Sequence, residues 1–361
     1  MTTTHPPDIA GRKADHIDLC ATGDVGFARK TTMFEQVELV HDALPELAID
    51  EIDTSVKVLG KTLRAPIIVA AMTGGTERAR EINRELAAIC EERGYGFGLG
   101  SQRAMLRGGK DDTYEVRDVA PTALILGNIG GVQARELPTD AVADLAGRVG
   151  ADAMCVHLNP AMEIVQPGGD RYFAGVIGAI ERLVEELGLP VVAKETGCGI
   201  GPRAARRLGR AGVQHVDVSG AGGTSWVAVE TERATAEARS LGTALRDWGV
   251  PTAASVIICK EARPRFSTII ATGGVSSGTD AAKAIALGAH VAGIARPVLQ
   301  AFMSGGREGA RAFLAGVEAE IRAVMLLVGA GSIRALRKAP RVLTGELPRW
   351  AELARARRDA T

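Results

Sequence analysis

The chain has 361 residues, with 43 Lys and Arg balanced by 43 Asp and Glu, so its formal net charge is zero. That balance argues against a protein whose main task is to neutralise nucleic-acid phosphates, and against a basic amphipathic face for a membrane surface. Hydrophobic residues make up 46% and charged residues 24%, which excludes a largely disordered chain. Glycine is frequent, at 44 residues, while aromatic residues are only 4%, so the glycines need an explanation.

The five cysteines are an odd number, widely spaced, with neither a C-x-x-C pair nor a Cys/His cluster of zinc spacing. This pattern is typical of a reducing compartment. The first residues lack the apolar core of a signal peptide, and no apolar run approaches the roughly 18 residues that span a bilayer. We therefore expect a cytoplasmic protein that acts on neither membranes nor nucleic acids.

Eight short runs rich in Val, Ile, Leu, Ala and Gly recur along the chain. They occupy residues 66–71, 95–99, 123–127, 153–158, 190–194, 215–219, 268–272 and 290–294. Such continuous apolar strands are expected where both faces of a parallel sheet are buried. Segments with charged residues at helical spacing lie between them, at residues 81–92, 140–148, 173–187, 203–211 and 279–287.

The regular alternation of strand and helix predicts an α/β fold, a closed (β/α)8 TIM barrel. We expect a single domain over residues 1–361, with a barrel core at about 64–300, an N-terminal extension at 1–60 and a C-terminal helical extension at 301–361. The long gap after the sixth strand predicts an insertion at residues 220–263. An open doubly wound sheet is the alternative, but no G-x-G-x-x-G with a following acidic residue supports it.

The ends of the predicted strands are polar or glycine-rich, as expected where a barrel places its site. Gly273 and Gly274 follow the seventh strand, and Ala295 and Arg296 the eighth. The loops after these strands are the usual phosphate site of such barrels, and a helix opening near Thr279 would add a favourable dipole. This pattern favours a phosphorylated ligand, although a plain Gly-Gly turn would look the same.

Other strand-end residues suggest two ligands. Lys194, Ser219, Thr224 and Asn128 outline a flavin mononucleotide (FMN) site, although Lys194 could instead form an ion pair with a carboxylate such as Asp217. Donors suited to a diphosphate come from Arg12, Lys13, Arg103, His157 and Asn159. Alternatively, Arg12 and Lys13 are surface charges and His157 is a core histidine. Glu163 could be an oxygen ligand for a divalent cation that also touches the diphosphate.

The motifs together resemble one family in order along nearly the whole chain. They are Arg12-Lys13-x-Asp15-His16-Ile17, Ala71-Met72-Thr73-Gly74-Gly75, Ser101-Gln102-Arg103, Asn128-Ile129-Gly130, His157-Leu158-Asn159, Gln166-Pro167-x-Gly169-Asp170-Arg171, Lys194-Glu195, Ser219-x-x-Gly222-Gly223-Thr224-Ser225-Trp226 and Gly273-Gly274. The ordered set resembles type 2 isopentenyl diphosphate isomerase.

The resemblance implies an FMN-binding TIM barrel that interconverts isopentenyl and dimethylallyl diphosphate in isoprenoid biosynthesis. Reduced FMN would act as acid and base, NADPH or NADH would reduce it, Mg²⁺ would be required, and the protein would be a homo-oligomer, a tetramer or octamer. FMN would contact Ala71, Met72, Thr73, Ser101, Asn128, Lys194, Ser219, Thr224, Gly273, Gly274, Ala295 and Arg296. The substrate would contact Arg12, Lys13, Ser101, Gln102, Arg103, His157, Asn159 and Met162. Catalytic roles would fall to His157, Glu163 and Glu230, with Glu163 also holding the metal.

Two positions depart from the family pattern. The family carries Gln directly before the metal-binding Glu, where this chain has Met162, and many relatives carry Arg where this chain has Ser276. A thioether cannot orient the substrate or move a proton as an amide can, unless Gln166 or Glu230 substitutes. Two alternatives stay open: an FMN oxidoreductase of the 2-hydroxy-acid oxidase type, which shares the barrel and the phosphate site, and a repurposed homologue that binds FMN and a diphosphate, which Met162 motivates.

Overall fold

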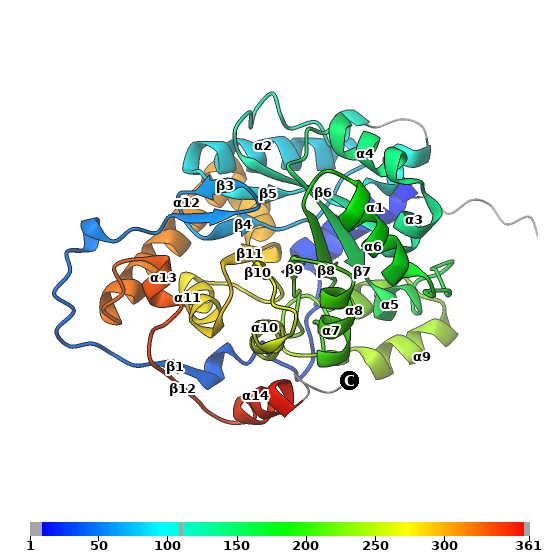
Figure 1. The fold of residues 1–361 in the computed structure, drawn as a ribbon. Helices are drawn as coiled ribbons and strands as arrows, with labels where there is room; N and C mark the ends of the chain where they lie inside the picture. Colours follow the sequence, from blue (N-terminus) through cyan, green and yellow to red (C-terminus); the bar gives the residue numbers. More distant parts are fainter. Residues whose placement is uncertain (1–8, 108–110, 357–361) are drawn as a thin grey trace, which may run out of the picture.

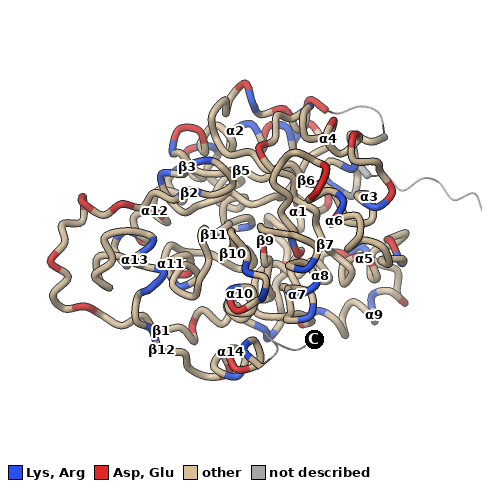
Figure 2. The backbone as a smooth tube through the Cα atoms, in the orientation of Figure 1, with Lys and Arg blue, Asp and Glu red and all other residues tan. Residues whose placement is uncertain are grey.

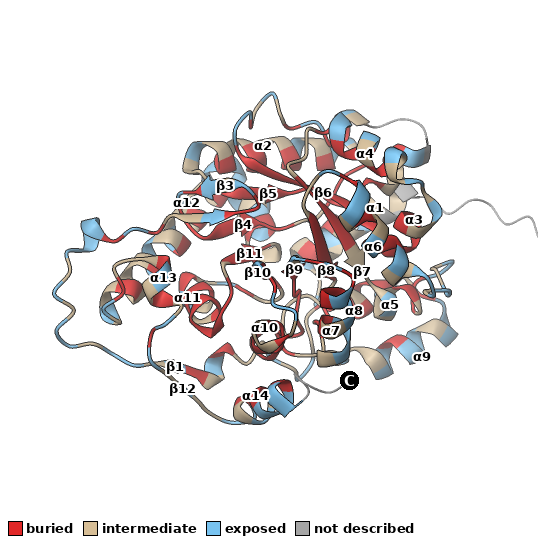
Figure 3. Ribbon diagram, viewed as in Figure 1, coloured by how far each residue is buried: buried red, intermediate tan, exposed pale blue. Residues whose placement is uncertain are grey.

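A computed structural model describes residues 9–107 and 111–356. Eight parallel strands close into a barrel in which each strand pairs with its neighbours in chain order, and helices surround it (Figure 1). The strands are β4 (Ile67–Val69), β5 (Gly96–Gly98), β6 (Leu124–Gly130), β7 (Ala153–Leu158), β8 (Val191–Glu195), β9 (His215–Asp217), β10 (Thr268–Ala271) and β11 (Val291–Ile294). The predicted (β/α)8 barrel is confirmed. Most strands are buried along their whole length (Figure 3), which is why they read as continuous apolar runs.

The helices around the barrel follow the charged segments of the sequence. They are α2 (Glu77–Arg93), α3 (Gly131–Glu136), α4 (Thr139–Arg148), α5 (Pro160–Glu163), α6 (Val176–Glu186), α7 (Pro202–Arg210), α8 (Trp226–Arg233), α9 (Ala236–Leu245), α10 (Thr252–Glu261), α11 (Gly278–Leu287) and α12 (Arg296–Leu327). Local signals set their ends: the Thr76 hydroxyl accepts a hydrogen bond from the Ala79 N–H at the start of α2, and Gly94 ends it at φ 70°.

The segment after β9 is longer than the other crossovers. Helix α10 packs against α7, β10 and α11, so it is the barrel helix that joins β9 to β10. Helices α8 and α9 pack on each other and precede it. The insertion predicted at residues 220–263 is therefore two added helices followed by an ordinary crossover helix.

The N-terminal extension closes the end of the barrel at which the strands begin. A hairpin of β2 (Val56–Val58) and β3 (Lys61–Leu63) packs Val58, Leu59 and Leu63 into one cluster with the inward-facing side chains of the strands. Leu59 and Gly60 both have positive φ, 49° and 83°, as a two-residue hairpin turn of this hand requires. The barrel interior is thus a filled core at this end.

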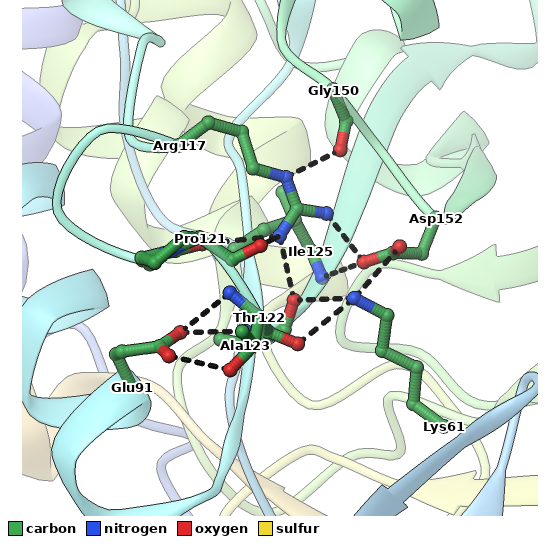
Figure 4. Close-up of polar contacts among 10 residues, drawn as sticks. Lys61, Glu91, Arg117, Pro121, Thr122, Ala123, Ile125, Gly150 and Asp152 are labelled. Atoms are coloured by element: carbon green, nitrogen blue, oxygen red, sulfur yellow. Dashed lines mark hydrogen bonds and ion pairs between the residues drawn. The ribbon is translucent and has the colours of Figure 1, made fainter.

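A polar network ties the start of β6 to the start of β7 at the same end (Figure 4). The Asp152 carboxylate lies 2.5 Å from the Arg117 guanidinium and 3.0 Å from the Lys61 ammonium, and it also accepts the Ile125 N–H. Glu91 accepts the N–H groups of Thr122 and Ala123. Because this is the N-terminal face of the strands, we interpret the network as stabilising.

The two extensions meet, which the sequence did not predict. Strand β1 (Val37–Leu39) pairs antiparallel with β12 (Arg341–Leu343), and between α12 and β12 lies α13 (Ile333–Leu336). The C-terminal helix α14 (Leu347–Ala356) packs on α10. The N-terminal helix α1 (Ile9–Thr22) packs against α12 and α8. Short 3-10 helices cover Phe34–Gln36, Ile49–Glu51, Gln102–Arg107 and Asp111–Thr113.

Basic and acidic residues are interspersed over the helices and loops (Figure 2). This mixture agrees with the zero net charge of the sequence. Among residues 9–107 and 111–356, the helices include none with the length and apolarity needed to cross a bilayer.

Candidate active site

One cavity of about 480 Å³ lies at the carboxyl ends of the barrel strands. Its volume falls within the range of about 300–1,000 Å³ that is usual for small-molecule sites. All twelve residues that the resemblance assigns to FMN line it: Ala71, Met72, Thr73, Ser101, Asn128, Lys194, Ser219, Thr224, Gly273, Gly274, Ala295 and Arg296. Residues assigned to the substrate or metal also line it, namely Lys13, Arg103, His157, Asn159, Met162 and Glu163.

Two described residues assigned to the substrate or to catalysis, Gln102 and Glu230, are not among those that line the cavity. Gln102 is completely buried; its amide donates to the Leu145 carbonyl at 2.8 Å and accepts the Asn128 N–H at 2.9 Å. Its side chain therefore pairs with the backbone of β6 instead of lining the cavity. Arg12 lies in α1, but its side chain is outside the described part of the structure.

Glu230 is the second of these residues, and it is connected to the cavity through a neighbour. It has no exposed surface, and its carboxylate lies 2.8 Å from Nε2 of His16 and 3.2 Å from the Arg233 guanidinium. His16 itself lines the cavity and packs edge-on against Trp226, with ring centroids 5.2 Å apart. The fold thus places His16 between Glu230 and the cavity.

His157 is held in one tautomer. The Asn128 amide donates through Nδ2 to the Leu99 carbonyl at 3.1 Å, so its Oδ1 faces Nδ1 of His157 at 2.8 Å. Nδ1 must therefore carry the proton, which leaves Nε2 as an acceptor in the neutral ring. Burial, and then the charges of Lys194, Arg103 and Lys13, lower the pKa of His157 to about 4. A bound anion would oppose the effect of these cations.

The Glu163 carboxylate is preorganised at the start of the loop after β7. It is 6% exposed and accepts hydrogen bonds from the Asn159 amide at 2.9 Å, the Gln166 amide at 3.4 Å and the Asp170 N–H at 2.7 Å. Short helix α5 begins at Pro160, and its single turn brings Asn159 and Glu163 together. A single carboxylate at a diphosphate site matches how Mg²⁺ is usually held, with the remaining ligands from substrate and water.

Lys13 reaches the cavity from α1. Its ammonium donates to the Tyr114 hydroxyl at 2.5 Å and to the Ser101 carbonyl at 3.1 Å. The Tyr114 hydroxyl in turn donates to the same carbonyl at 2.7 Å. Tyr114 is completely buried, so it fixes where the Lys13 charge lies. Lys13 is therefore a cavity residue, and its alternative interpretation as a plain surface charge does not hold.

The strand-end glycines on the other side of the cavity allow two loops to touch. A Cβ on Gly223 would lie 2.3 Å from the Gly274 nitrogen, and Gly274 has φ 72°. The sequence suggested that the N-terminus of α11 would face a phosphate. In the structure, the N–H groups of Gly278 and Thr279 in its first turn already donate to the Glu320 carboxylate. Instead, α12 begins at the cavity wall, where Ala295, Arg296 and Pro297 lie.

Sequence reasoning gave no role to several cavity residues. They are His16, Gln133, Gln166, Thr196, Trp226 and Thr272. Gln166, named only as a substitute for the missing Gln, donates to Glu163, and Gln133 donates to Asp170 at 3.2 Å. His16, Gln166 and Trp226 belong to the family motifs, and that membership could have identified them as site residues. Gln133 and Thr196 each lie within three residues of a motif.

A scan against family models matches the FMN-dependent dehydrogenase family at residues 8–106 and 171–342. The isopentenyl-diphosphate delta-isomerase of Methanothermobacter thermautotrophicus is 44% identical over 344 residues, covering 95% of each chain. That of Pyrococcus abyssi is 44% identical, covering 94% of each chain, and that of Halobacterium salinarum is 42% identical, covering 98% of each. The chain belongs to the isopentenyl-diphosphate delta-isomerase family. The resemblance drawn from the motifs is confirmed.

Solved structures share the fold of this delta-isomerase family member. A mandelate oxidase variant with (S)-mandelic acid matches with a TM-score of 0.61 and 19% identity, covering 94% of this chain and 96% of that one. A flavocytochrome b2 variant with sulfite bound matches with a TM-score of 0.66 and 20% identity, covering 90% and 81%. At this level of identity the likeness supports the barrel architecture alone.

The cavity of this family member also has the polar groups that an FMN would need. The hydroxyl oxygens of Thr73 and Thr196 are buried and have no hydrogen-bond partner in the described part of the chain, and both residues line the cavity. Buried polar atoms are normally paired, so two unpaired hydroxyls, one after β4 and one after β8, indicate a ligand with polar edges. The polar residues that line the cavity therefore fit FMN.

Proposed function

We propose that this protein converts isopentenyl diphosphate to dimethylallyl diphosphate, with FMN kept reduced by NADPH or NADH and with Mg²⁺ bound to the diphosphate. The observation that carries the proposal is that one cavity gathers the twelve residues assigned to FMN together with Lys13 and Arg103, two of the cations assigned to a diphosphate. The names of relatives at 42–44% identity over nearly the full chain support the same reaction.

Moving a double bond by one carbon needs one proton added to an alkene and another removed, through a tertiary cation. When bound, reduced FMN supplies an acid and base next to the alkene and an electron-rich ring that favours nearby positive charge. The chain supplies the positions: Lys13 and Arg103 bind the diphosphate, and His157 donates to it from Nε2 when the bound anion favours the imidazolium. Trp226 and Met162 cover the apolar end of the substrate.

The pair of His16 and Glu230 provides a place to hold a proton at the apolar end of the cavity. Nε2 of His16 shares a hydrogen bond with Glu230 Oε1, and Glu230 is shielded from solvent. This pair takes the role of proton holder where Met162 offers a thioether in place of the family amide. Gln166 is less suited, because its amide already donates to Glu163.

The proposed function is tested by incubating purified protein with FMN, NADPH, Mg²⁺ and isopentenyl diphosphate in D₂O. NMR would follow the appearance of dimethylallyl diphosphate and deuterium exchange at the substrate carbons. Both signals are expected. Absence of both, with FMN bound and reduced, would overturn the proposal. Oxidation of a 2-hydroxy acid by the same preparation would favour the oxidoreductase alternative, and FMN and diphosphate binding without turnover would favour the repurposed homologue.

The metal assignment has its own test. Glu163→Gln removes the single negative charge offered to Mg²⁺ while retaining the shape of the side chain. Half-maximal activity should then need at least tenfold more Mg²⁺, whereas Glu352→Gln, at an exposed position of α14, should leave the titration unchanged. An unchanged Mg²⁺ titration for Glu163→Gln would refute the role of Glu163.

The proposal also includes a cytoplasmic location and a homo-oligomer. Exposed apolar side chains on the N-terminal extension support self-association, with Leu44 82% exposed and Val40 and Ile49 each 47% exposed. Sedimentation of the purified protein would test the oligomer, and a monomer at micromolar concentration would refute it.

A further inference from the structure

The floor of the cavity contains a buried ion pair. Lys194 at the end of β8 is 8% exposed, and its ammonium lies 2.7 Å from Oδ2 of Asp217 at the end of β9. The two residues are direct partners in the β8–β9 register, so their side chains point into the barrel at one level. Lys194 borders the cavity, whereas Asp217, which is 4% exposed, does not.

Thr272, after β10, completes the arrangement. Its hydroxyl accepts a hydrogen bond from Lys194 at 3.3 Å and donates to Oδ1 of Asp217 at 2.5 Å. The Ser219 N–H also reaches this oxygen, at 3.3 Å. Each group therefore has one defined direction of donation, and the ammonium can neither turn nor leave without breaking two bonds.

The surroundings make this pair electrostatically strong. Below it, Leu126, Cys155 and Ile270 line a residual void of only about 10 Å³, so bulk water does not reach the charges from the barrel interior. In such a low-dielectric setting a lone ammonium would impose a large positive potential on the cavity. A carboxylate 2.7 Å away turns that charge into a short dipole whose field falls off much faster.

We propose that Asp217 and Thr272 are positioning residues that hold Lys194 at the cavity floor and cancel most of its positive charge. The inference rests on the proposed function, in which a substrate cation forms beside an electron-rich flavin. A full positive charge at the floor would oppose that cation and would make the reduced flavin a weaker base. With Asp217 in place, Lys194 can still donate a hydrogen bond into the cavity without adding net charge.

The proposal is tested with FMN-loaded protein carrying Asp217→Asn, Thr272→Val or Thr272→Ser. The readouts are FMN affinity from flavin fluorescence, the midpoint potential from dithionite titration, and turnover of isopentenyl diphosphate. Asp140→Asn, an exposed carboxylate on α4, is the matched control for loss of one negative charge.

Asp217→Asn should bind reduced flavin about tenfold more tightly relative to oxidised flavin, a rise of about 30 mV for a two-electron couple, while turnover falls at least tenfold. Thr272→Val should raise the potential by a smaller amount. Thr272→Ser, which keeps the hydroxyl, should have the potential of the wild-type protein. A purely structural role would lower FMN affinity without raising the potential.

An unchanged or lowered potential in both Asp217→Asn and Thr272→Val, with FMN bound, would overturn the proposal. If Asp217→Asn does not fold, the comparison of Thr272→Val with Thr272→Ser decides the question alone. Failure of the unmodified protein to bind FMN would instead refute the proposed function, so the two failures are distinguishable.

Discussion

His157 should make the protein less stable as the pH falls below neutral. Its pKa is about 4 in the folded protein against 6.5 for an ordinary histidine, because burial and then the cations Lys194, Arg103 and Lys13 disfavour the charged ring. The perturbation is His157→Gln, which keeps an amide donor for Asn128 but cannot titrate. The variant should therefore lose the part of the acid sensitivity that comes from protonation of His157.

The sign follows from proton uptake. Between pH 6.5 and about 4 the unfolded chain binds a proton at His157 that the folded chain does not, so the free energy of unfolding falls as the pH falls through this window. At about 1.4 kcal/mol per pH unit, the interval corresponds to at most about 3.5 kcal/mol. Because the ring borders a solvent-accessible cavity, this is an upper limit. Above pH 6.5 the contribution is constant.

The assay is urea denaturation of both proteins at pH 7.5, 6 and 4.5. The wild-type protein should lose more stability than His157→Gln between the first and last pH, by about 1–3 kcal/mol. His290, whose pKa is also lowered to about 4 by burial, is present in both proteins and cancels in the difference. NMR titration of the His157 ring gives a direct check, and inorganic diphosphate should raise its midpoint. Equal acid sensitivity of the two proteins, or a ring midpoint near 6.5, would refute the reasoning.

Three further predictions concern the polar network at the N-terminal ends of the strands and the cavity at their carboxyl ends. Asp152→Asn should lower the free energy of unfolding by about 1–3 kcal/mol, because it removes the charge shared by the two cations drawn in Figure 4. Asp144→Asn, in an exposed i,i+4 pair, should change it by less than about 0.5 kcal/mol, and equal effects in urea denaturation would contradict the assignment. Tyr114→Phe removes the hydroxyl that holds Lys13 and should raise KM for isopentenyl diphosphate about 3–10-fold with little change in kcat; a fall in kcat at constant KM would show a different role. Met162→Gln should raise kcat about 10–100-fold, as one recovered hydrogen bond to the substrate of about 1–3 kcal/mol allows, and no gain would mean that the His16–Glu230 pair already supplies all that the amide would add.

Much of the site could be predicted because each residue lies at a fixed place in a repeating unit. A strand buried on both faces reads as an apolar run, and the residue after it lies at the carboxyl end of the barrel whatever the rest of the chain does. Lys194, Ser219 and Asn128 were found on this basis, and all line the cavity. The strand limits were less certain: β6 continues to Gly130, past the predicted end at 127, so Asn128 lies within the strand.

Only the tertiary structure decided which way a side chain faces and which distant segments meet. Gln102 follows a strand as Ser101 does, yet it turns away to support β6, because backbone groups there needed a partner. Lys194 satisfies both of the interpretations that the sequence left open, since it borders the cavity and pairs with Asp217. The position of α1 over the barrel mouth depends on contacts with residues 88 to 276 positions away, such as Ser101, Glu230 and Arg296. Local pattern carries no information on such pairings, so the sequence by itself determined the barrel and its polar rim, while packing between remote segments determined the cavity and the charges within it.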